Sequence, residues 1–329
     1  FGKINTLISL AKDRDIIVQL EIWNRFDWYN TTWGNNPFRP AKNSNYTASS
    51  SGLNNSYSDF KDNPFADGVP GHPEYEAASS ARKAKYDLVR GYQEIFVDHL
   101  LSITLQYDNV LYCMNNETHV HPAWGKYWID FVQNKAASQG KTVYCTDMFD
   151  DGWDLQNSDN YEDVYDTPNT YTFVEIAQNN QIKTVGGAEK HWANILYVRN
   201  QISNSIRPIN NTKIYASDIW KPNSFRLSSS TRYGDFAAVN SFWMNIVGGC
   251  ASARFHRRYW GIGCNSTLAR NCSKAVRKME TKVKMWELAP RNDLLSGRGT
   301  ITYNFPGYSF KHEPFVHGEA YLATKPGEK

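Results

Sequence analysis

Six short apolar runs recur along the chain, and each run is followed by acidic, amide or aromatic residues. The runs cover residues 16–20, 110–114, 142–145, 171–174, 213–216 and 249–253. Short, nearly continuous apolar runs are typical of strands in a parallel sheet that is covered on both faces. In an α/β barrel, all strands of the parallel sheet end at the same face, so the polar residues that follow the runs are expected to meet there.

Helical periodicity separates the apolar runs. Apolar residues recur at helical spacing in residues 5–12, 82–107, 123–138, 189–203, 235–247 and 267–288. This alternation predicts repeated βα units and a parallel sheet. We therefore expect an α/β fold of the (β/α)8 TIM-barrel type. Six runs are two fewer than eight and the chain begins at Phe1, so we expect that N-terminal strands are missing.

The barrel is expected to cover residues 1–290. Behind it, residues 291–329 contain short β-like pieces at 299–303 and 319–322. We expect this C-terminal region to be the start of a β-sandwich-like domain.

Residues Asn115, Asn116 and Glu117 follow the second apolar run and are the strongest candidates for chemistry. A glutamate at a strand end can act as a general acid if its surroundings raise its pKa, and a neighbouring amide can hold a sugar hydroxyl. We expect Glu117 to be a proton donor and Asn116 to position a hydroxyl. The alternative is a strand end followed by an ordinary polar loop.

Further candidates for substrate binding follow the other apolar runs. They are Glu21, Trp23, Arg25, Asp27, Trp153, Gln178, Arg254, His256 and Trp260. The three tryptophans are expected to stack on sugar rings, since aromatic faces are flat and apolar. Arg254 and His256 belong to a basic cluster that can pair with sulfate or uronate groups. An acidic or sulfated polysaccharide would then be the natural substrate, although ion pairs with nearby acids explain the cluster equally well.

The long stretch from Trp28 to Tyr75 is rich in Asn, Ser, Gly, Pro and aromatic residues. Long ordered loops are usually lids or binding loops. Its aromatic residues are expected to wall a substrate cleft, namely Trp28, Tyr29, Trp33, Phe38 and Tyr46. Disorder is the alternative.

Composition narrows the class of partner. The chain has 329 residues and a net charge of +3, which is too small to indicate nucleic acid. The sequence has no membrane-spanning segment and no zinc-ligand spacing, and we expect no cofactor and no metal. A calcium site in the acidic cluster 147–154 is the alternative. The oligomeric state stays open.

The five cysteines do not decide the compartment. Cys113, Cys145 and Cys250 lie in expected strands and are predicted to be buried thiols. Cys264 and Cys272 flank a short loop and could form a disulfide bridge.

Several segments together resemble the bacterial apiosidase-like glycoside hydrolases over most of the chain. They are residues 18–27, 109–118, 173–179, 208–215 and 249–256. The resemblance implies a barrel of clan A, in which the acid/base is a glutamate preceded by asparagine after the fourth strand. Glu117 and Asn116 match this pattern. Similar proteins often carry a C-terminal β-sandwich, sometimes labelled a collagen-binding domain, and residues 297–329 look like its beginning.

The chain departs from the family at the second carboxylate. Clan A enzymes place the nucleophile, usually a glutamate, after the seventh strand, whereas the matching run here has Lys213 and no glutamate. The candidates for the second carboxylate are Asp147, Asp218 and Glu175, in that order. Two carboxyl groups ~5–5.5 Å apart indicate a retaining enzyme and ~6.5–9.5 Å an inverting one, so the partner of Glu117 decides the stereochemistry.

We therefore expect a glycoside hydrolase that is secreted, periplasmic or on the cell surface and that degrades a polysaccharide. The alternative is a catalytically silent barrel that binds glycans or belongs to an extracellular surface assembly. Lys213 in place of a nucleophile favours that alternative.

Overall fold

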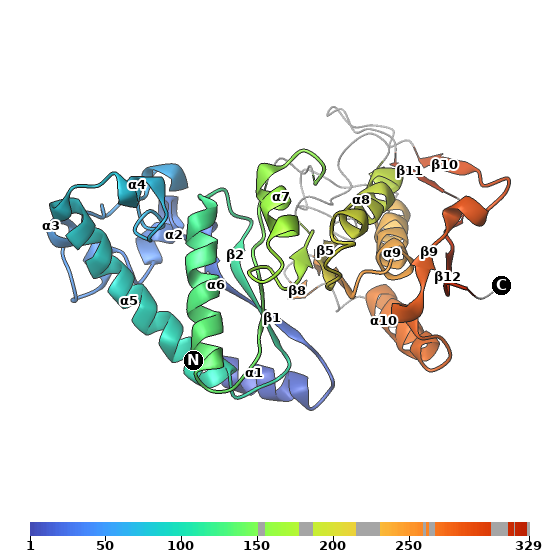
Figure 1. Cartoon of the computed structure of the whole chain (residues 1–329), viewed down its shortest axis with the longest axis horizontal. Helices are drawn as coiled ribbons and strands as arrows, with labels where there is room; N and C mark the ends of the chain where they lie inside the picture. Colours follow the sequence, from blue (N-terminus) through green and yellow to red (C-terminus); the bar gives the residue numbers. More distant parts are fainter. Residues whose placement is uncertain are drawn as a thin grey trace. The chain divides into compact units, whose positions relative to one another are not determined.

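The computed structural model describes residues 1–150, 155–177, 187–214, 231–258, 261–262, 267–303, 315–318 and 320–327. The chain divides into two compact units (Figure 1). The first unit comprises residues 1–150 and 167–172, and the second comprises 151–166 and 173–329. Each unit is described separately.

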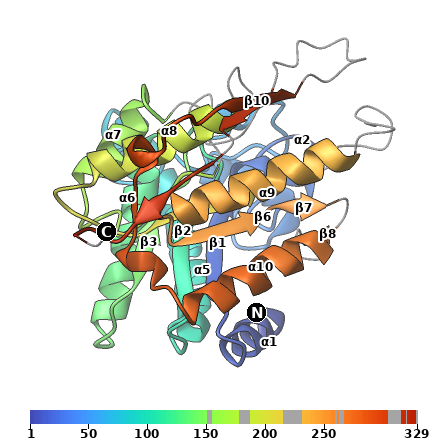
Figure 2. The same cartoon turned by 90° about the vertical axis from the view of Figure 1, so that its right-hand side faces the viewer.

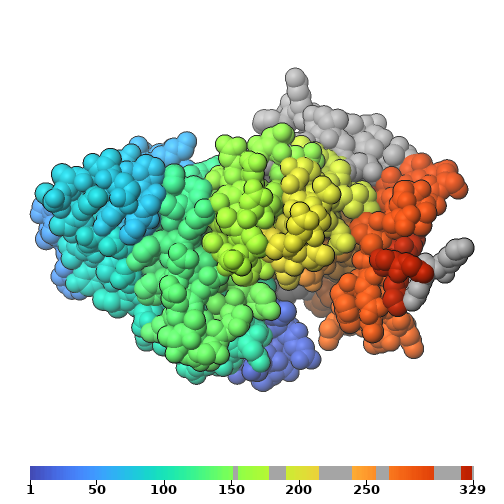
Figure 3. Space-filling view, in the orientation of Figure 1, coloured from blue at the N-terminus to red at the C-terminus, as the bar shows by residue number. Residues whose placement is uncertain are grey.

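The first unit contains a three-stranded parallel sheet in the order β1-β2-β3. Its strands are β1 (Val18–Asn24), β2 (Val110–Asn116) and β3 (Tyr144–Thr146). Its long helices are α1 (Gly2–Lys12), α5 (Ser80–Thr104) and α6 (Pro122–Ala137). Helix α6 packs on β2 and β3. Helices α5 and α6 form much of the visible surface of this unit in Figure 3.

Local sequence explains where these helices begin. The Ser79 hydroxyl accepts a hydrogen bond from the Arg82 backbone amide at the start of α5, which replaces a bond that the helix itself cannot make. Pro122 occupies the first turn of α6, where its fixed φ suits a helix and its missing N–H costs nothing.

The stretch between β1 and α5 folds into short helices around an aromatic core. The elements are η1 (Arg25–Asp27), α2 (Asn30–Asn35), η2 (Pro40–Lys42), α3 (Ala48–Ser51), η3 (Phe60–Asp62) and α4 (Pro73–Glu76). Trp28, Trp33 and Tyr46 are 2%, 0% and 6% exposed. The prediction that these three rings wall a cleft is wrong, because they fill the core instead. Tyr29 and Phe38 are partly exposed.

The second unit contains a parallel sheet in the order β4-β5-β6. Its strands are β4 (Val174–Glu175), β5 (Ile209–Ile214) and β6 (Ser252–Phe255). Its helices are α7 (Asp159–Asp166), α8 (Gly187–Gln201), α9 (Thr231–Val247) and α10 (Thr267–Glu280). Helix α9 packs on β5 and β6, and α10 lies beside α9 (Figure 2).

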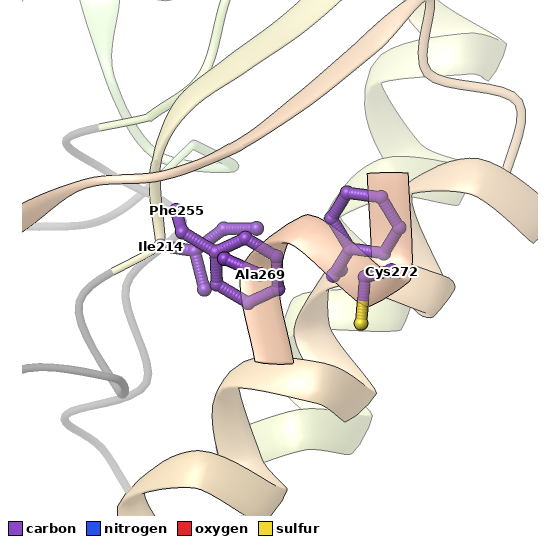
Figure 4. Packing of buried hydrophobic residues seen from close by; sticks show 5 residues of the cluster. Ile214, Phe255, Ala269 and Cys272 are labelled. Carbon is purple, nitrogen blue, oxygen red and sulfur yellow. The ribbon is translucent and has the colours of Figure 1, made fainter. Parts of the chain in front are cut away.

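A compact apolar cluster holds α9 and α10 against this sheet. Ile214, Phe255, Ala269 and Cys272 meet in the cluster (Figure 4), together with Phe242. The rings of Phe242 and Phe255 are stacked, with centroids 5.1 Å apart. Apolar side chains from two strands and two helices therefore form one core.

Short antiparallel pairs and turns complete the second unit. They are β7 (Arg257–Arg258) with β8 (Gly261–Ile262), β9 (Ala289–Pro290) with β12 (Ala323–Thr324), β10 (Thr300–Tyr303) with β11 (Phe315–Gly318), and the turns η6 (Met285–Glu287) and η7 (Asn292–Leu294). The C-terminal region is thus β-rich. The predicted domain boundary after residue 290 stays a prediction.

The predicted (β/α)8 barrel is wrong. The described strands form two three-stranded parallel sheets and three antiparallel pairs. A closed barrel pairs every strand on both sides, whereas β1 and β3 each pair only with β2 among the described strands. The alternation of strands and helices indicates that neighbouring strands are parallel. It does not fix how many strands join one sheet, because that depends on pairing between distant segments.

None of the helices in the described ranges is both long and apolar enough to cross a membrane. Cys113, Cys145 and Cys250 are buried free thiols, as predicted. Cys272 is also a buried free thiol, so the suggested bridge has no support, and Cys264 lies outside the described residues. Burial raises the pKa of the Cys250 thiol to about 12, which keeps it protonated and unreactive.

Candidate functional site at the carboxyl edge of the first sheet

The three strands of the first sheet bring polar residues to one edge. Trp23 and Asn24 of β1 pair in register with Asn115 and Asn116 of β2, and Asp147 directly follows β3. Because the strands are parallel, their carboxyl ends lie at the same edge. The sequence pattern predicted this juxtaposition for these three strands.

Asp147 is held in a closed network of hydrogen bonds. Its Oδ1 accepts from the backbone amides of Asn115 and Met148, both at 2.9 Å. The Asn115 side-chain amide donates to Asp147 Oδ1 at 3.0 Å and to Oδ2 at 2.8 Å. Trp124 Nε1 in turn donates to Asn115 Oδ1 at 3.0 Å. The network joins β2, β3 and α6.

Burial controls the ionisation of Asp147. The residue is 1% exposed, and removal of its carboxyl from water raises the pKa to about 7, although the hydrogen bonds from Asn115 and Met148 act in the opposite direction. A raised pKa is what a general acid requires. A carboxyl that is sealed in this way nevertheless cannot touch a substrate, so the geometry favours a positioning role for Asp147.

Glu117 stands at the end of β2 in an unusual backbone conformation. Its φ is +50°, in the left-handed region that costs a residue with a side chain roughly 1–2 kcal/mol. The residues on both sides are fixed: Asn116 pairs with Asn24 in the sheet, and the Thr118 amide donates to the Met148 carbonyl at 2.8 Å. Glu117 is itself partly exposed. Such strain at a partly open carboxylate is typical of functional sites.

Asn116 belongs to a chain of side-chain amides that reaches Asp27. The Asn116 side-chain nitrogen donates to Asn24 Oδ1 at 3.0 Å. The Asn24 side-chain nitrogen donates to Asp27 Oδ2 at 3.2 Å. Asp27 is exposed. Two of the predicted binding residues, Asn116 and Asp27, are therefore linked through Asn24, which the sequence pattern did not single out.

A second group at this edge consists of Arg25, Asp150 and His119. Arg25 is 8% exposed, and its Nη2 lies 2.6 Å from Asp150 Oδ2. His119 Nε2 lies 3.3 Å from the same oxygen. The imidazole is stacked on the Phe60 ring, with centroids 5.9 Å apart and planes at 19°. Asp150 is thus contacted by a buried side chain, Arg25, and by an exposed one, His119.

The remaining predicted residues of the first unit differ in exposure. Glu21 of β1 is exposed. Trp23 is 5% exposed, and its ring contacts five other rings, namely Phe38, Phe65, Phe96, Trp124 and Trp128. The Trp23 ring is covered by these neighbours and does not offer a face to a sugar.

Three of the predicted residues in the second unit belong to the described part of the chain. Glu175 is fully buried, and its Oε1 accepts from the backbone amides of Ala177 at 3.0 Å and Thr212 at 3.1 Å. Arg254 donates to the Thr212 carbonyl at 3.0 Å. The His256 backbone amide donates to the Ile214 carbonyl. These contacts hold the ends of β4, β5 and β6 together.

Asp218, Trp153, Gln178 and Trp260 lie outside the described residues, so their predicted roles stay predictions. Within the described ranges, no group of three or more His, Cys, Asp or Glu residues is arranged to hold a metal ion. Asp147 and Asp150 of the suggested calcium cluster are instead engaged with Asn115 and Arg25.

The group formed by Arg25, Asp150 and His119 was only partly visible in the sequence. Arg25 was a candidate and Asp150 belonged to the acidic cluster, but His119 was missed. Arg25 and Asp150 are 125 positions apart. The one signal for His119 is its position two residues behind Glu117 at the same strand end.

The chain matches no protein-family model, no curated protein and no solved structure. The resemblance to apiosidase-like hydrolases therefore stays an expectation from the sequence, and the residues of this edge carry the functional argument.

Proposed function

We propose that the chain is a glycoside hydrolase in which Glu117 donates a proton to the oxygen of the glycosidic bond. The observation that carries the proposal is the left-handed conformation of Glu117 between two fixed residues at the carboxyl edge of β1-β2-β3. The fixed neighbours give the backbone of Glu117 one position at this edge, and a positioned donor is what proton transfer in a transition state requires.

Neighbouring groups supply substrate contacts in this proposal. Asn116 and Asn24 hold their amide groups in one orientation through their mutual hydrogen bond, so that either can meet a sugar hydroxyl without losing rotamer freedom. The Asp150 carboxylate orients the His119 imidazole, which can also bond a hydroxyl. Phe60, stacked on His119, extends this surface with an apolar ring.

The position of the second carboxylate decides the stereochemistry, and burial narrows the choice among the three candidates. Asp147 and Glu175 are 1% and 0% exposed and accept several hydrogen bonds, which argues against direct attack on a sugar. Asp218 keeps its place as a prediction from the sequence. If a second carboxylate does not act, the candidate function is glycan binding without hydrolysis, and the burial of Asp147 and Glu175 favours that alternative.

Replacement of Glu117 tests the proposal. Glu117→Gln removes the transferable proton and keeps the size of the side chain, so the release of reducing ends from a panel of acidic and neutral polysaccharides should fall by about 10²–10⁴-fold. Binding of the same polysaccharide, measured by calorimetry, should persist. Glu162→Gln, at an exposed glutamate of α7, is the matched control and should keep full activity.

Two results would oppose the proposal. Hydrolysis by Glu117→Gln at the rate of the native chain would exclude Glu117 as the proton donor. Binding of a polysaccharide without hydrolysis by the native chain would favour the catalytically silent alternative.

A further inference from the structure

Helix α10 and the turn behind it carry an unusual concentration of positive charge. Residues 267–284 contain six lysines and arginines and one glutamate, a net charge of +5, whereas the whole chain has +3. The rest of the chain is therefore slightly acidic. The net positive charge of the chain therefore comes from this one segment.

The basic side chains lie on one face of α10. Arg270, Lys274 and Lys278 are spaced four residues apart and are exposed, so they follow one another on the same side of the helix. Lys282, also exposed, follows four residues later, just behind the helix. We call Arg270, Lys274, Lys278 and Lys282 the basic stripe. Its three members within α10 are about 6 Å apart along the helix axis, within the screening length of about 8 Å at physiological salt.

The opposite face of α10 is occupied by the core. Ala269 and Cys272 are buried, and Val276 packs against the same cluster, which includes Phe242 and Phe255. The helix is thus held by its apolar face and presents its charged face to solvent. A helix anchored in this way cannot turn its main apolar face toward a lipid bilayer, which is how amphipathic helices bind membranes.

The lysines of the stripe are not neutralised within the described part of the chain. Arg277 pairs with Glu280 at 3.1 Å and Lys284 with Glu287 at 3.2 Å. Lys274, Lys278 and Lys282 form no ion pair with a described carboxylate. Neighbouring like charges repel one another and destabilise the helix, so an external anion would relieve this repulsion.

We infer that the basic stripe of α10 binds an anionic, sulfated or uronate-containing polysaccharide. Charged groups repeated along an extended chain match a row of ammonium groups, and Trp286, which is 75% exposed, follows the stripe with a flat ring of the kind that sugars stack on. The choice of a glycan rather than a nucleic acid rests on the proposed function. The stripe and Glu117 are separate features, so they can be tested separately.

Retention on immobilised dextran sulfate, compared with neutral dextran, tests the inference. The native chain should be retained on dextran sulfate alone, and retention should weaken as salt rises. The double variant Lys274→Gln/Lys278→Gln should bind about tenfold more weakly, as expected when two exposed ion pairs are lost. Lys3→Gln/Lys42→Gln has the same change of charge at exposed lysines of the first unit and should bind like the native chain.

Three results would overturn the inference: no retention of the native chain, equal weakening in both double variants, or tighter binding of oligothymidylate or of anionic phospholipid vesicles than of dextran sulfate. The measurement is repeated with Glu117→Gln, which should bind dextran sulfate normally. A native chain that is retained on dextran sulfate but hydrolyses no polysaccharide would contradict the proposed active site alone. A native chain that hydrolyses a polysaccharide but is not retained would contradict the stripe alone.

Discussion

Asp147 shows how one buried carboxyl organises the end of a strand. Its hydrogen bonds from Asn115 and Met148 fix the backbone on both sides of the candidate edge. A buried carboxyl is costly to ionise, and removal of this carboxyl would leave the buried donors of Asn115 and Met148 without a partner. Because ionisation of Asp147 is costly in the folded chain, the stability of the first unit depends on pH.

The stability of the native chain should fall as pH rises because of Asp147. The pKa of this carboxyl is about 7 in the folded chain, against 3.8 for the unperturbed group. Between these values the folded chain holds a proton that the unfolded chain has released, so unfolding is favoured at higher pH. From pH 5 to pH 8 the native chain should lose roughly 3 kcal/mol that Asp147→Asn does not lose.

Denaturant unfolding at several pH values between 5 and 8 measures this difference. Asp13→Asn, at an exposed aspartate behind α1, is the control and should follow the native chain. A pH dependence of Asp147→Asn equal to that of the native chain would show that Asp147 does not titrate in this range.

At the level of single residues, the sequence was a better guide to which side chains lie at the edge than to which of them are accessible to a ligand. Asn116 ends β2, Glu117 follows it and Asp147 follows β3, so all three lie at strand ends as expected, although not in a barrel. Trp23 was expected to stack on sugar, but aromatic rings from the following loop and from α6 cover it. Sequence spacing fixes the face of a strand on which a side chain lies. It does not reveal which distant segments cover that face.

At the scale of elements, helix α6 approaches the network so closely that it requires glycine. A Cβ added at Gly125 would lie 2.1 Å from Asp147 Oδ2 and 3.1 Å from its Cγ. Real Cβ atoms do not come this close, so either the helix or the carboxyl must move. Gly125 lies in the first turn of α6, where this close approach leaves no room for a side chain, although glycine has an unfavourable helix propensity.

Gly125→Ala should lower the free energy of unfolding, although alanine is the better helix former. Gly91 in α5 is the matched control, because a Cβ there meets nothing within 4 Å. Gly91→Ala should raise stability by up to about 1 kcal/mol. Thermal or denaturant unfolding of the two variants checks the prediction. Equal stabilisation by both substitutions would mean that α6 does not press on Asp147.

The long helices were predicted well, whereas α7 (Asp159–Asp166) was missed, the expected helix 267–288 ends at Glu280, and the later strands were predicted less well. The expected helix 123–138 is α6 (Pro122–Ala137), because its apolar side chains recur at a helical period. The strand expected at 213–216 lies instead at β5 (Ile209–Ile214). Its residues Asn210, Asn211 and Thr212 are buried polar groups. The Asn211 side chain, for example, donates to Asn245 Oδ1 at 3.1 Å, and an apolar pattern cannot reveal such a partner.

At the scale of the whole molecule, the alternation of strands and helices predicted a mixed α/β chain with parallel pairs, and it failed on the closed barrel. Parallel order within β1-β2-β3 and β4-β5-β6 follows from βα units, since a helix returns the chain to the start of the next strand. Closure is a property of all strands together. It cannot be read from runs that are each a few residues long.

Charge is a second property of the whole molecule. In the sequence, only the basic cluster around Arg254 and His256 indicated an anionic partner. The net charge of +3 gave no such indication, because the average hides the +5 segment of α10 and the turn behind it. The distribution of charge over elements, and not its sum, indicates the surface on which an anionic chain can lie.

In the proposed function, Glu117 stands at the scissile bond. The most direct measurement is a crystal structure of Glu117→Gln with an oligosaccharide from the polysaccharide that serves as substrate in the proposed function. The amide at position 117 should lie about 2.6–3.2 Å from a glycosidic oxygen, with Asn116 or Asn24 bonded to a neighbouring hydroxyl. A saccharide bound elsewhere, with no contact to position 117, would exclude Glu117 as the proton donor.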